Sequence, residues 1–205
     1  MHMKRCTRSV RVSAVLVALS MAALAAVKTT SNKPSAIAIK NFGCLNENYY
    51  RGAQPQERDY PALASLGIKT IIDLQRDGEA NERQLTETNG MKFFRFEMTT
   101  TDRPNPQTVT QFLKIVNDTA NQPVFVHCHG GRHRTGVMTA IYRLTHDSWT
   151  ADRAFAEMKQ YEFGKGFGHG ALREYLYDYY AGLERQNAGD RTDLVKATAG
   201  GGSKN

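Results

Sequence analysis

The most reactive stretch of the chain is HCHGGRHRTG at residues 127–136, in which five residues separate Cys128 from Arg134. A cysteine becomes nucleophilic when its thiol loses the proton, and nearby cations and backbone N–H groups favour that loss. The planar guanidinium of Arg134 can bind two oxygens of a phosphate group. This pair therefore predicts attack of a thiolate on phosphorus, with a phosphocysteine intermediate.

A strand, a glycine-containing loop and a helix must hold these two side chains in place. The apolar run PVFVHC at 123–128 predicts a strand, and a helical pattern opens near Thr135. Backbone N–H groups of the loop and of the helix N-terminus can bind an oxyanion between them. We therefore expect a phosphate cradle. Its predicted substrate-binding residues are His129, Gly130, Gly131, Arg132, His133 and Arg134.

The full string His-Cys-x5-Arg-Thr-Gly resembles the signature of the cysteine-dependent protein-tyrosine and dual-specificity phosphatases. The resemblance implies that Cys128 is the nucleophile and that Arg134 binds the phosphate. It implies further that the hydroxyl of Thr135 aids breakdown of the intermediate. A chance Cys-x5-Arg is the alternative, but the preceding strand, the two glycines and the following helix argue against it.

Three further stretches are similar to one branch of this family: NYYRGAQP at 48–55, LGIKTIIDL at 66–74, and residues 136–164. With the signature, they resemble bacterial exported dual-specificity phosphatases, and more distantly the fungal and plant enzymes that act on inositol pyrophosphates. The resemblance covers nearly all of 41–185. Arg51, in the first stretch, either steadies the site or has an ordinary surface or salt-bridge role.

Phosphoester cleavage also needs a proton for the leaving oxygen, usually from a carboxylic acid on a mobile loop. The stretch MTTTDRPNP at 98–106 follows a predicted strand and contains one acid, Asp102. Asp102 is the predicted general acid, and then the general base for the attacking water. An aspartate that only forms a proline-rich turn is the alternative. Glu97 and Asp73 are further candidates, but both lie in or at the end of predicted strands.

The alternation of strands and helical patterns predicts an α/β fold, with helices on the faces of a sheet. The family resemblance narrows this to a single protein-tyrosine-phosphatase-like domain with a central, mostly parallel sheet. Strands are predicted at 69–74, 91–98 and 123–128. Helices are predicted at 55–66 and 79–89, and as amphipathic patterns that include Val109, Ala151 and Leu172.

The two ends of the chain differ in composition from its middle. A basic start followed by the apolar run at 12–27 predicts a signal peptide at 1–27, and an uncleaved membrane anchor is the alternative. Residues 28–40 are a predicted linker, 41–185 the catalytic domain, and the polar, glycine-rich 186–205 a disordered tail. Both alternatives predict export, to the periplasm, with membrane contact only through the N-terminal segment.

The net charge does not indicate a nucleic-acid partner. The formal +7 includes four cations of the N-terminal segment, so without them 7 − 4 = +3 remains. No basic stripe interleaved with aromatic residues occurs elsewhere. The histidines around Cys128 do not predict a metal site either, because Arg132 and Arg134 would repel a cation. We expect neither a metal nor a cofactor.

These observations predict a metal-independent phosphatase for phosphotyrosine, with phosphoserine and phosphothreonine as further substrates. An inositol polyphosphate or phosphoinositide is the first alternative, because His129, Arg132 and His133 add cations that suit a polyanion. The order Gly-Arg-His-Arg also resembles the Gly-Lys-His-Arg of the inositol-pyrophosphate enzymes. Both histidines would add charge below about pH 6.5. Pairing of Arg132 with a carboxylate would weaken this preference.

An inactive phosphate-binding module is the second alternative, although Cys128, Arg134 and Asp102 together argue against it. Export would also expose the nucleophile to oxidation. Cys44 is then its possible intramolecular partner, since Cys6 lies in the segment that would be removed. A bridge between Cys44 and Cys128 is therefore a further hypothesis, as a route to inactivation.

Overall fold

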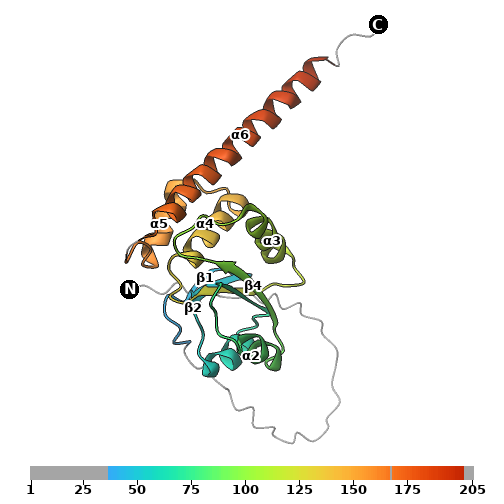
Figure 1. The fold of residues 1–205 in the computed structure, drawn as a ribbon. Helices are drawn as coiled ribbons and strands as arrows, with labels where there is room; N and C mark the ends of the chain where they lie inside the picture. Colours follow the sequence, from blue (N-terminus) through green and yellow to red (C-terminus); the bar gives the residue numbers. More distant parts are fainter. Residues whose placement is uncertain (1–36, 167, 201–205) are drawn as a thin grey trace, which may run out of the picture.

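A computed structural model describes residues 37–166 and 168–200, with side chains placed as far as residue 192 (Figure 1). The predicted α/β fold is confirmed. The strands are β1 (Gly43–Asn46), β2 (Tyr49–Ala53), β3 (Thr70–Gln75), β4 (Lys92–Met98) and β5 (Val124–Cys128). The helices are a 3-10 turn (Glu57–Asp59), α1 (Tyr60–Ser65), α2 (Glu82–Thr88), α3 (Pro106–Asn117), α4 (Arg134–His146), α5 (Ala151–Gln160) and α6 (Gly170–Gly200).

The sheet has the order β1-β2-β5-β3-β4. Strand β1 runs antiparallel to β2, and the other neighbours are parallel. Strand β5 is therefore central, and both of its faces are buried. In an open parallel sheet, ligands bind beyond the carboxyl ends of the strands. Cys128 is the last residue of β5, so the nucleophile lies at that edge.

Two apolar cores cover the two faces of the sheet. One face packs against α3, α4, α5 and the first turns of α6, with Phe112, Ile141, Met158 and Leu172 in its core. The other face packs against α1 and α2. Figure 1 shows these helices on opposite sides of the strands. The three-layer arrangement fixes the end of β5 and the start of α4 relative to each other.

The three predicted strands are present as β3, β4 and β5, but β1 and β2 were not predicted. β1 and β2 are only four and five residues long, and β2 reads YYRGA, with neither the alternation nor the apolar run of a typical strand. The domain also begins before residue 41. Ile39 is 7% exposed in the second core, and the Lys40 carbonyl accepts a hydrogen bond from the Ala53 N–H. The last residues of the predicted linker are thus part of the domain.

The segment predicted as a disordered tail is helical through Gly200, which corrects that prediction. Alanine, leucine, arginine, glutamine and glutamate favour a helix, and they let α6 continue beyond the core in spite of its glycines. Side chains from Glu184 to Thr192 are exposed, and α6 projects from the body of the molecule (Figure 1). Residues 201–205 lie outside the described part.

The predicted leader at 1–27, and the linker as far as residue 36, also lie outside the described residues. The choice between a signal peptide and an anchor therefore stays a prediction. Within 37–166 and 168–200, no helix combines the length and the apolar character that crossing a membrane requires.

Removal of residues 186–205 is expected to cost little stability. The side chains of 186–192 are exposed, so their loss removes little buried apolar area. The truncated chain should unfold within about 3 °C of the full chain, which corresponds to less than about 1 kcal/mol. Thermal unfolding followed by circular dichroism measures this. A much larger drop in Tm would mean that the distal part of α6 supports the core.

Candidate active site

The nucleophile lies where β5 ends and the loop at 129–133 leads into α4. Cys128 is 3% exposed and is a free thiol. The bridge to Cys44 is therefore not formed in this structure. The first N–H groups of a helix have no partner within the helix. At the start of α4 they lie beside the thiol, and with the helix dipole they favour a negative charge there.

Three successive carbonyls of the loop are hydrogen-bonded to residues 41–54, the segment that contains β1 and β2. The Gln54 N–H donates to the carbonyl of residue 129 at 3.3 Å, and the Asn41 side chain to that of Gly130 at 2.8 Å. Arg51 Nη2 donates to the Gly131 carbonyl at 2.6 Å. The N–H of a planar peptide points opposite to its C=O. The N–H groups of residues 130 and 132 are therefore turned away from this segment, as an oxyanion cradle requires.

Gly131 is a loop position at which any other residue would be strained. Its φ of +63° is in the left-handed region, and a Cβ there would lie 2.5 Å from the carbonyl carbon of Gly52. Its N–H donates to the Cys128 carbonyl at 3.3 Å, which closes the turn after the nucleophile. The backbone of β2 thus supports the loop by direct contact.

The surroundings of Cys128 favour the thiolate. Burial by itself raises the pKa of this thiol, but the hydroxyl and the N–H of Thr135 outweigh burial, together with the charges of Arg134 and His127. The net effect is a lowered pKa. The Thr135 hydroxyl is buried and has no hydrogen-bond acceptor other than this sulfur among the described residues. A deprotonated sulfur would supply that acceptor.

His127 is held by a buried carboxylate pair beneath the loop. Its Nε2 lies 2.8 Å from Glu82 Oε1, its Nδ1 lies 3.9 Å from Asp73 Oδ1, and all three side chains are fully buried. Burial lowers the pKa of His127, but the contact and charge of Glu82, followed by the charge of Asp73, raise it overall. Gln54 also donates to Glu82 at 2.9 Å, which joins this cluster to the loop.

The same three residues have the donor types of a metal site, with their ligand atoms within 4.8 Å of one another. A cation already fills this position. Arg95 lies 2.8 Å from Asp73 and 3.6 Å from Glu82, and the two carboxylates raise the pKa of His127, which favours its charged form. A metal would have to displace these charges. The cluster is better described as a charge-balanced support for the nucleophile.

Arg134 and Asp102 line one cavity of about 270 Å³. Arg134 is 7% exposed, and its Nη1 donates to the Met98 carbonyl at 3.2 Å and contacts Asp77 Oδ1 at 3.5 Å. Asp102 is an exposed residue of the same lining, and Thr99 Oγ1 donates to its carboxylate at 2.7 Å. The structure therefore brings the predicted acid and the predicted phosphate-binding arginine to one opening.

The alternative acids differ in position. Asp73 is fully buried and bonded to Arg95, so it cannot reach a substrate. Glu97 does not line the cavity of Arg134 and Asp102. Asp77, which the sequence analysis did not single out, does line this cavity and contacts Arg134. Its signal was its place directly after the predicted strand at 69–74, at the carboxyl edge of the sheet.

The loop that carries Asp102 is joined to the phosphate loop through two stacked histidines. The ring of His169 lies 3.4 Å from that of His133, and its Nδ1 contacts the Thr100 carbonyl at 3.2 Å. Burial, followed by the charges of His169 and Arg132, lowers the pKa of His133 to about 4. This corrects the expectation that His133 gains charge below pH 6.5, since it stays neutral until much lower pH.

Arg132 is paired with a carboxylate. Its Nε lies 3.5 Å from Glu162, which also contacts Lys40 at 3.5 Å and Lys165 at 2.6 Å. Hydrogen bonding from Lys165 holds the pKa of Glu162 at about 2, aided by the charge of Lys40. Within the described residues, Glu162 therefore partly neutralises the charge of Arg132. Of the two possibilities raised by the sequence, a cation available to a polyanion or one paired with a carboxylate, the structure has the second. His129 is exposed at the rim.

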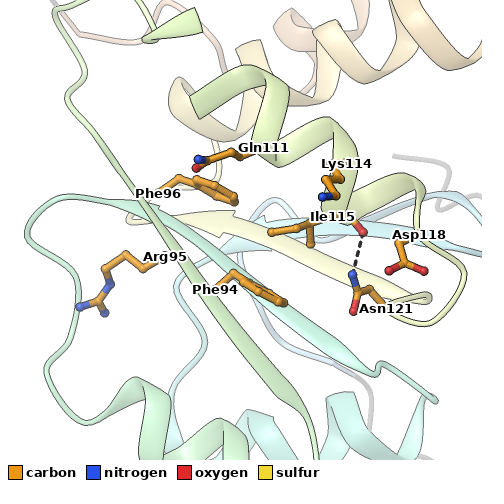
Figure 2. Close-up of a pocket in the computed structure, with 8 residues that line it drawn as sticks. All are labelled: Phe94, Arg95, Phe96, Gln111, Lys114, Ile115, Asp118 and Asn121. Atoms are coloured by element: carbon orange, nitrogen blue, oxygen red, sulfur yellow. Dashed lines mark hydrogen bonds between the residues drawn. The ribbon is translucent and has the colours of Figure 1, made fainter. Parts of the chain in front are cut away.

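A second cavity, of about 400 Å³, lies between β4 and α3 (Figure 2). Figure 2 shows Phe94, Phe96 and Ile115 facing it, with Lys114 and Asp118 at its edge. None of the predicted catalytic residues lines it. The size of a cavity therefore does not identify the reaction site. The smaller, polar cavity is the one lined by two of the predicted catalytic residues, Arg134 and Asp102.

Comparisons with known proteins agree with the phosphate-binding geometry of this site. The sequence model described as "Tyrosine phosphatase family" matches residues 36–194, most of the chain. The chain belongs to this family. The chain is 32% identical over 130 residues to "Probable tyrosine-protein phosphatase DG1060" of Dictyostelium discoideum, covering 61% of this chain and 78% of that protein.

The chain is also similar to proteins named for another substrate. It is 30% identical over 125 residues to "Inositol diphosphatase DSP3" of Arabidopsis thaliana, covering 58% of this chain and 61% of that protein. It therefore spans less than two thirds of that relative. The overlap with the Dictyostelium protein is longer.

Solved structures share the fold. The core catalytic domain of the PP-IP phosphatase SIW14 from S. cerevisiae has a TM-score of 0.64 at 24% identity, over 77% of this chain and 96% of that one. TpbA from P. aeruginosa has a TM-score of 0.55 at 23% identity, over 69% and 91%. These values confirm a phosphatase fold and leave the substrate open.

Substitution of Gly131 by alanine is expected to disrupt the cradle. The Cβ would force the loop away from Gly52, and a shift of about 1 Å can cost about 100-fold in rate. Gly130→Ala is the matched control, because its nearest neighbour is the end of the flexible Arg132 side chain at 3.0 Å. Its loss should be much smaller. Steady-state kinetics with p-nitrophenyl phosphate measure both, and equal losses would contradict the backbone contact.

Proposed function

We propose that this phosphatase hydrolyses phosphotyrosine in proteins through a phosphocysteine intermediate, with phosphoserine and phosphothreonine as further substrates. The proposal needs no metal or cofactor, because side chains of this chain supply each chemical role. It rests on one observation above all. A buried thiol with a lowered pKa lies just before a helix whose first residue, Arg134, lines a cavity together with Asp102.

In the first step the Cys128 sulfur attacks phosphorus, so that an S–P bond forms as the P–O bond to the tyrosine oxygen breaks. The carboxylic acid of Asp102 gives its proton to that leaving oxygen. Loop N–H groups and Arg134 bind the phosphoryl oxygens, on which charge is spread in the transition state.

In the second step Asp102, now a carboxylate, takes a proton from a water molecule that attacks phosphorus. The S–P bond breaks and phosphate leaves. The sulfur departs as a thiolate, and the buried Thr135 hydroxyl can donate to it. Cys128 and Asp102 thereby return to their starting protonation states.

The charge around the loop supports a monophosphorylated side chain as substrate. Glu162 pairs with Arg132, and His133 is neutral at physiological pH. Fewer cations are therefore free to bind a second phosphate than the sequence suggested. A phosphotyrosine needs Arg134, the loop amides and an opening, and the structure supplies these.

An inositol polyphosphate or phosphoinositide is the second candidate, and two observations favour it. Several relatives at 28–32% identity are named inositol diphosphatases. Lys40, Arg132 and Lys165 all gather around Glu162 beside the loop. A polyanion that displaced Glu162 would meet three cations.

The chemistry is tested by two substitutions. Cys128→Ser should lose turnover of an aryl phosphate and still bind tungstate, because the cradle remains. Asp102→Asn should lower kcat by about 10²–10⁴ on phenyl phosphate, and less on p-nitrophenyl phosphate, whose leaving group needs little protonation. Turnover by Cys128→Ser at the wild-type rate would refute the proposal, and binding without any turnover in the wild type would indicate the inactive module.

Glu97→Gln is the matched control for the acid, since this carboxylate does not line the cavity and should leave kcat unchanged. Asp77→Asn tests the remaining acid in the cavity. If Asp77→Asn shows the leaving-group dependence and Asp102→Asn does not, the role of general acid passes to Asp77.

The substrate is tested by kcat/KM for a phosphotyrosine peptide and for an inositol pyrophosphate. The wild type should prefer the peptide. Glu162→Gln should shift the ratio toward the polyanion by about tenfold, or 1.4 kcal/mol, because it frees the cations around it. Lys165→Gln, which removes one of those cations, should not. A wild type that prefers the inositol pyrophosphate would establish the second candidate.

A further inference from the structure

Arg51 is a fully buried arginine directly beneath the phosphate loop. It lies on β2 opposite Val126 of β5, and none of its surface is exposed. Its Nη2 donates to the Gly131 carbonyl at 2.6 Å, and its guanidinium carbon lies 3.9 Å from the centre of the Tyr161 ring. The surface role considered from the sequence is therefore wrong.

This buried cation has no carboxylate partner in the described part of the chain. No Asp or Glu oxygen there lies within ion-pair distance, 4.0 Å, of Arg51, and its Nε and Nη1 make no hydrogen bond. Transfer of an unpaired charge from water to a protein interior costs several kcal/mol. Burial accordingly lowers the pKa of Arg51. A buried arginine of this kind calls for an anion nearby.

Four ionisable groups interact electrostatically with Arg51, in decreasing order Tyr161, Tyr49, Glu157 and Cys128. Burial raises the pKa of both tyrosines, so they are neutral at physiological pH. Glu157 is already bound by Arg143, at 3.0 and 2.8 Å. Cys128 remains. Of the four groups, it is the one that can become an anion and that, unlike Glu157, is not already bound by Arg143.

The other cations at the nucleophile already have partners. Glu82 balances His127, and Asp77 contacts Arg134. Arg51 thus differs from both, because its compensating charge arises only when the thiol ionises or a phosphoryl group enters the loop. Charges interact strongly at this depth, since the surroundings screen them less than water does.

We propose that Arg51 is a positioning residue that supplies the buried counter-charge of the Cys128 thiolate and holds the Gly131 carbonyl away from the phosphate. The two roles use different atoms of one guanidinium. Nη2 orients the peptide between residues 131 and 132, and the charge acts across the loop on the sulfur. Arg51 acts through the loop and does not touch the substrate.

This inference rests on the proposed function only for the identity of the nucleophile, and the test of its charge role does not need turnover. The rate of iodoacetamide modification of Cys128 is measured against pH in the full chain, by mass spectrometry of the peptide that contains it. Arg51→Met, which keeps the bulk and removes the charge, should raise the pKa of the thiol by about one unit or more. Retained turnover in Cys128→Ser would end the proposed function and leave this titration interpretable.

Tyr49→Phe is the matched control. Tyr49 lies on the same strand, is fully buried and bonds to Thr139 at 3.2 Å, so its substitution perturbs packing without removing a charge. The pKa of the Cys128 thiol should stay within about 0.3 unit of the wild type, well below the shift of about one unit expected for Arg51→Met. A folded Arg51→Met with an unchanged thiol pKa would overturn the proposal, as would an equal shift in Tyr49→Phe.

If Arg51→Met does not fold, Arg51→Lys decides the question. Lysine keeps the charge but lacks the planar fork that reaches the Gly131 carbonyl. The thiol pKa should then stay within about half a unit of the wild type, while kcat/KM falls about tenfold or more. Wild-type kcat/KM in this variant would overturn the positioning role, and a thiol pKa near that of a free cysteine would overturn the charge role.

Discussion

The site depends on the hydrogen bonds that turn three consecutive carbonyls of the phosphate loop toward residues 41–54. A short loop of peptides presents either oxygens or N–H groups to its interior, and an anion is bound only by the second arrangement. Asn41, Arg51 and Gln54 each donate a hydrogen bond to one of these carbonyls. The three bonds hold the oxygens outward and so favour the second arrangement. The contact of Gly131 with Gly52 leaves no space between the two backbones. A hairpin that carries none of the signature residues therefore determines whether the signature works.

Charge balance beneath the loop follows from the same packing. Helix α2 contributes Glu82, β3 contributes Asp73 and β5 contributes His127, so three elements meet in one buried cluster. Breaking a buried pair by removing one partner costs about 3–5 kcal/mol, which keeps such clusters intact. The charge of His127 lowers the pKa of the Cys128 thiol, and the carboxylates that pair with His127 do not themselves contact the sulfur. The charged cluster beneath the loop and the backbone N–H groups of the loop thus both favour a negative charge on the Cys128 sulfur.

The acid and the nucleophile belong to separate loops, yet the structure connects them. His133 is part of the phosphate loop, and its ring stacks on His169, which in turn contacts the loop of Asp102. Closing of an acid loop over substrate is a common step in phosphoryl transfer, and such loops come from the less stable parts of a fold. Stacking of two rings gives this connection a modest strength, as a loop that closes over substrate requires.

The sequence alone determined the reaction centre and the core elements. The spacing of Cys128, Arg134 and Thr135 is local, and strands β3, β4 and β5 have apolar patterns that need no tertiary information. The position of Asp102 between a strand and a helix was also readable. What only the tertiary structure decided is which distant side chains meet the loop. Arg51, Glu82 and Glu162 are ordinary polar residues in the sequence. Their effects come from burial and from neighbours that are distant along the chain, as in the Arg51–Gly131 bond, which joins residues 80 positions apart. Charge, burial and hydrogen bonding set a pKa through short distances in space, and the order of residues along the chain does not contain those distances.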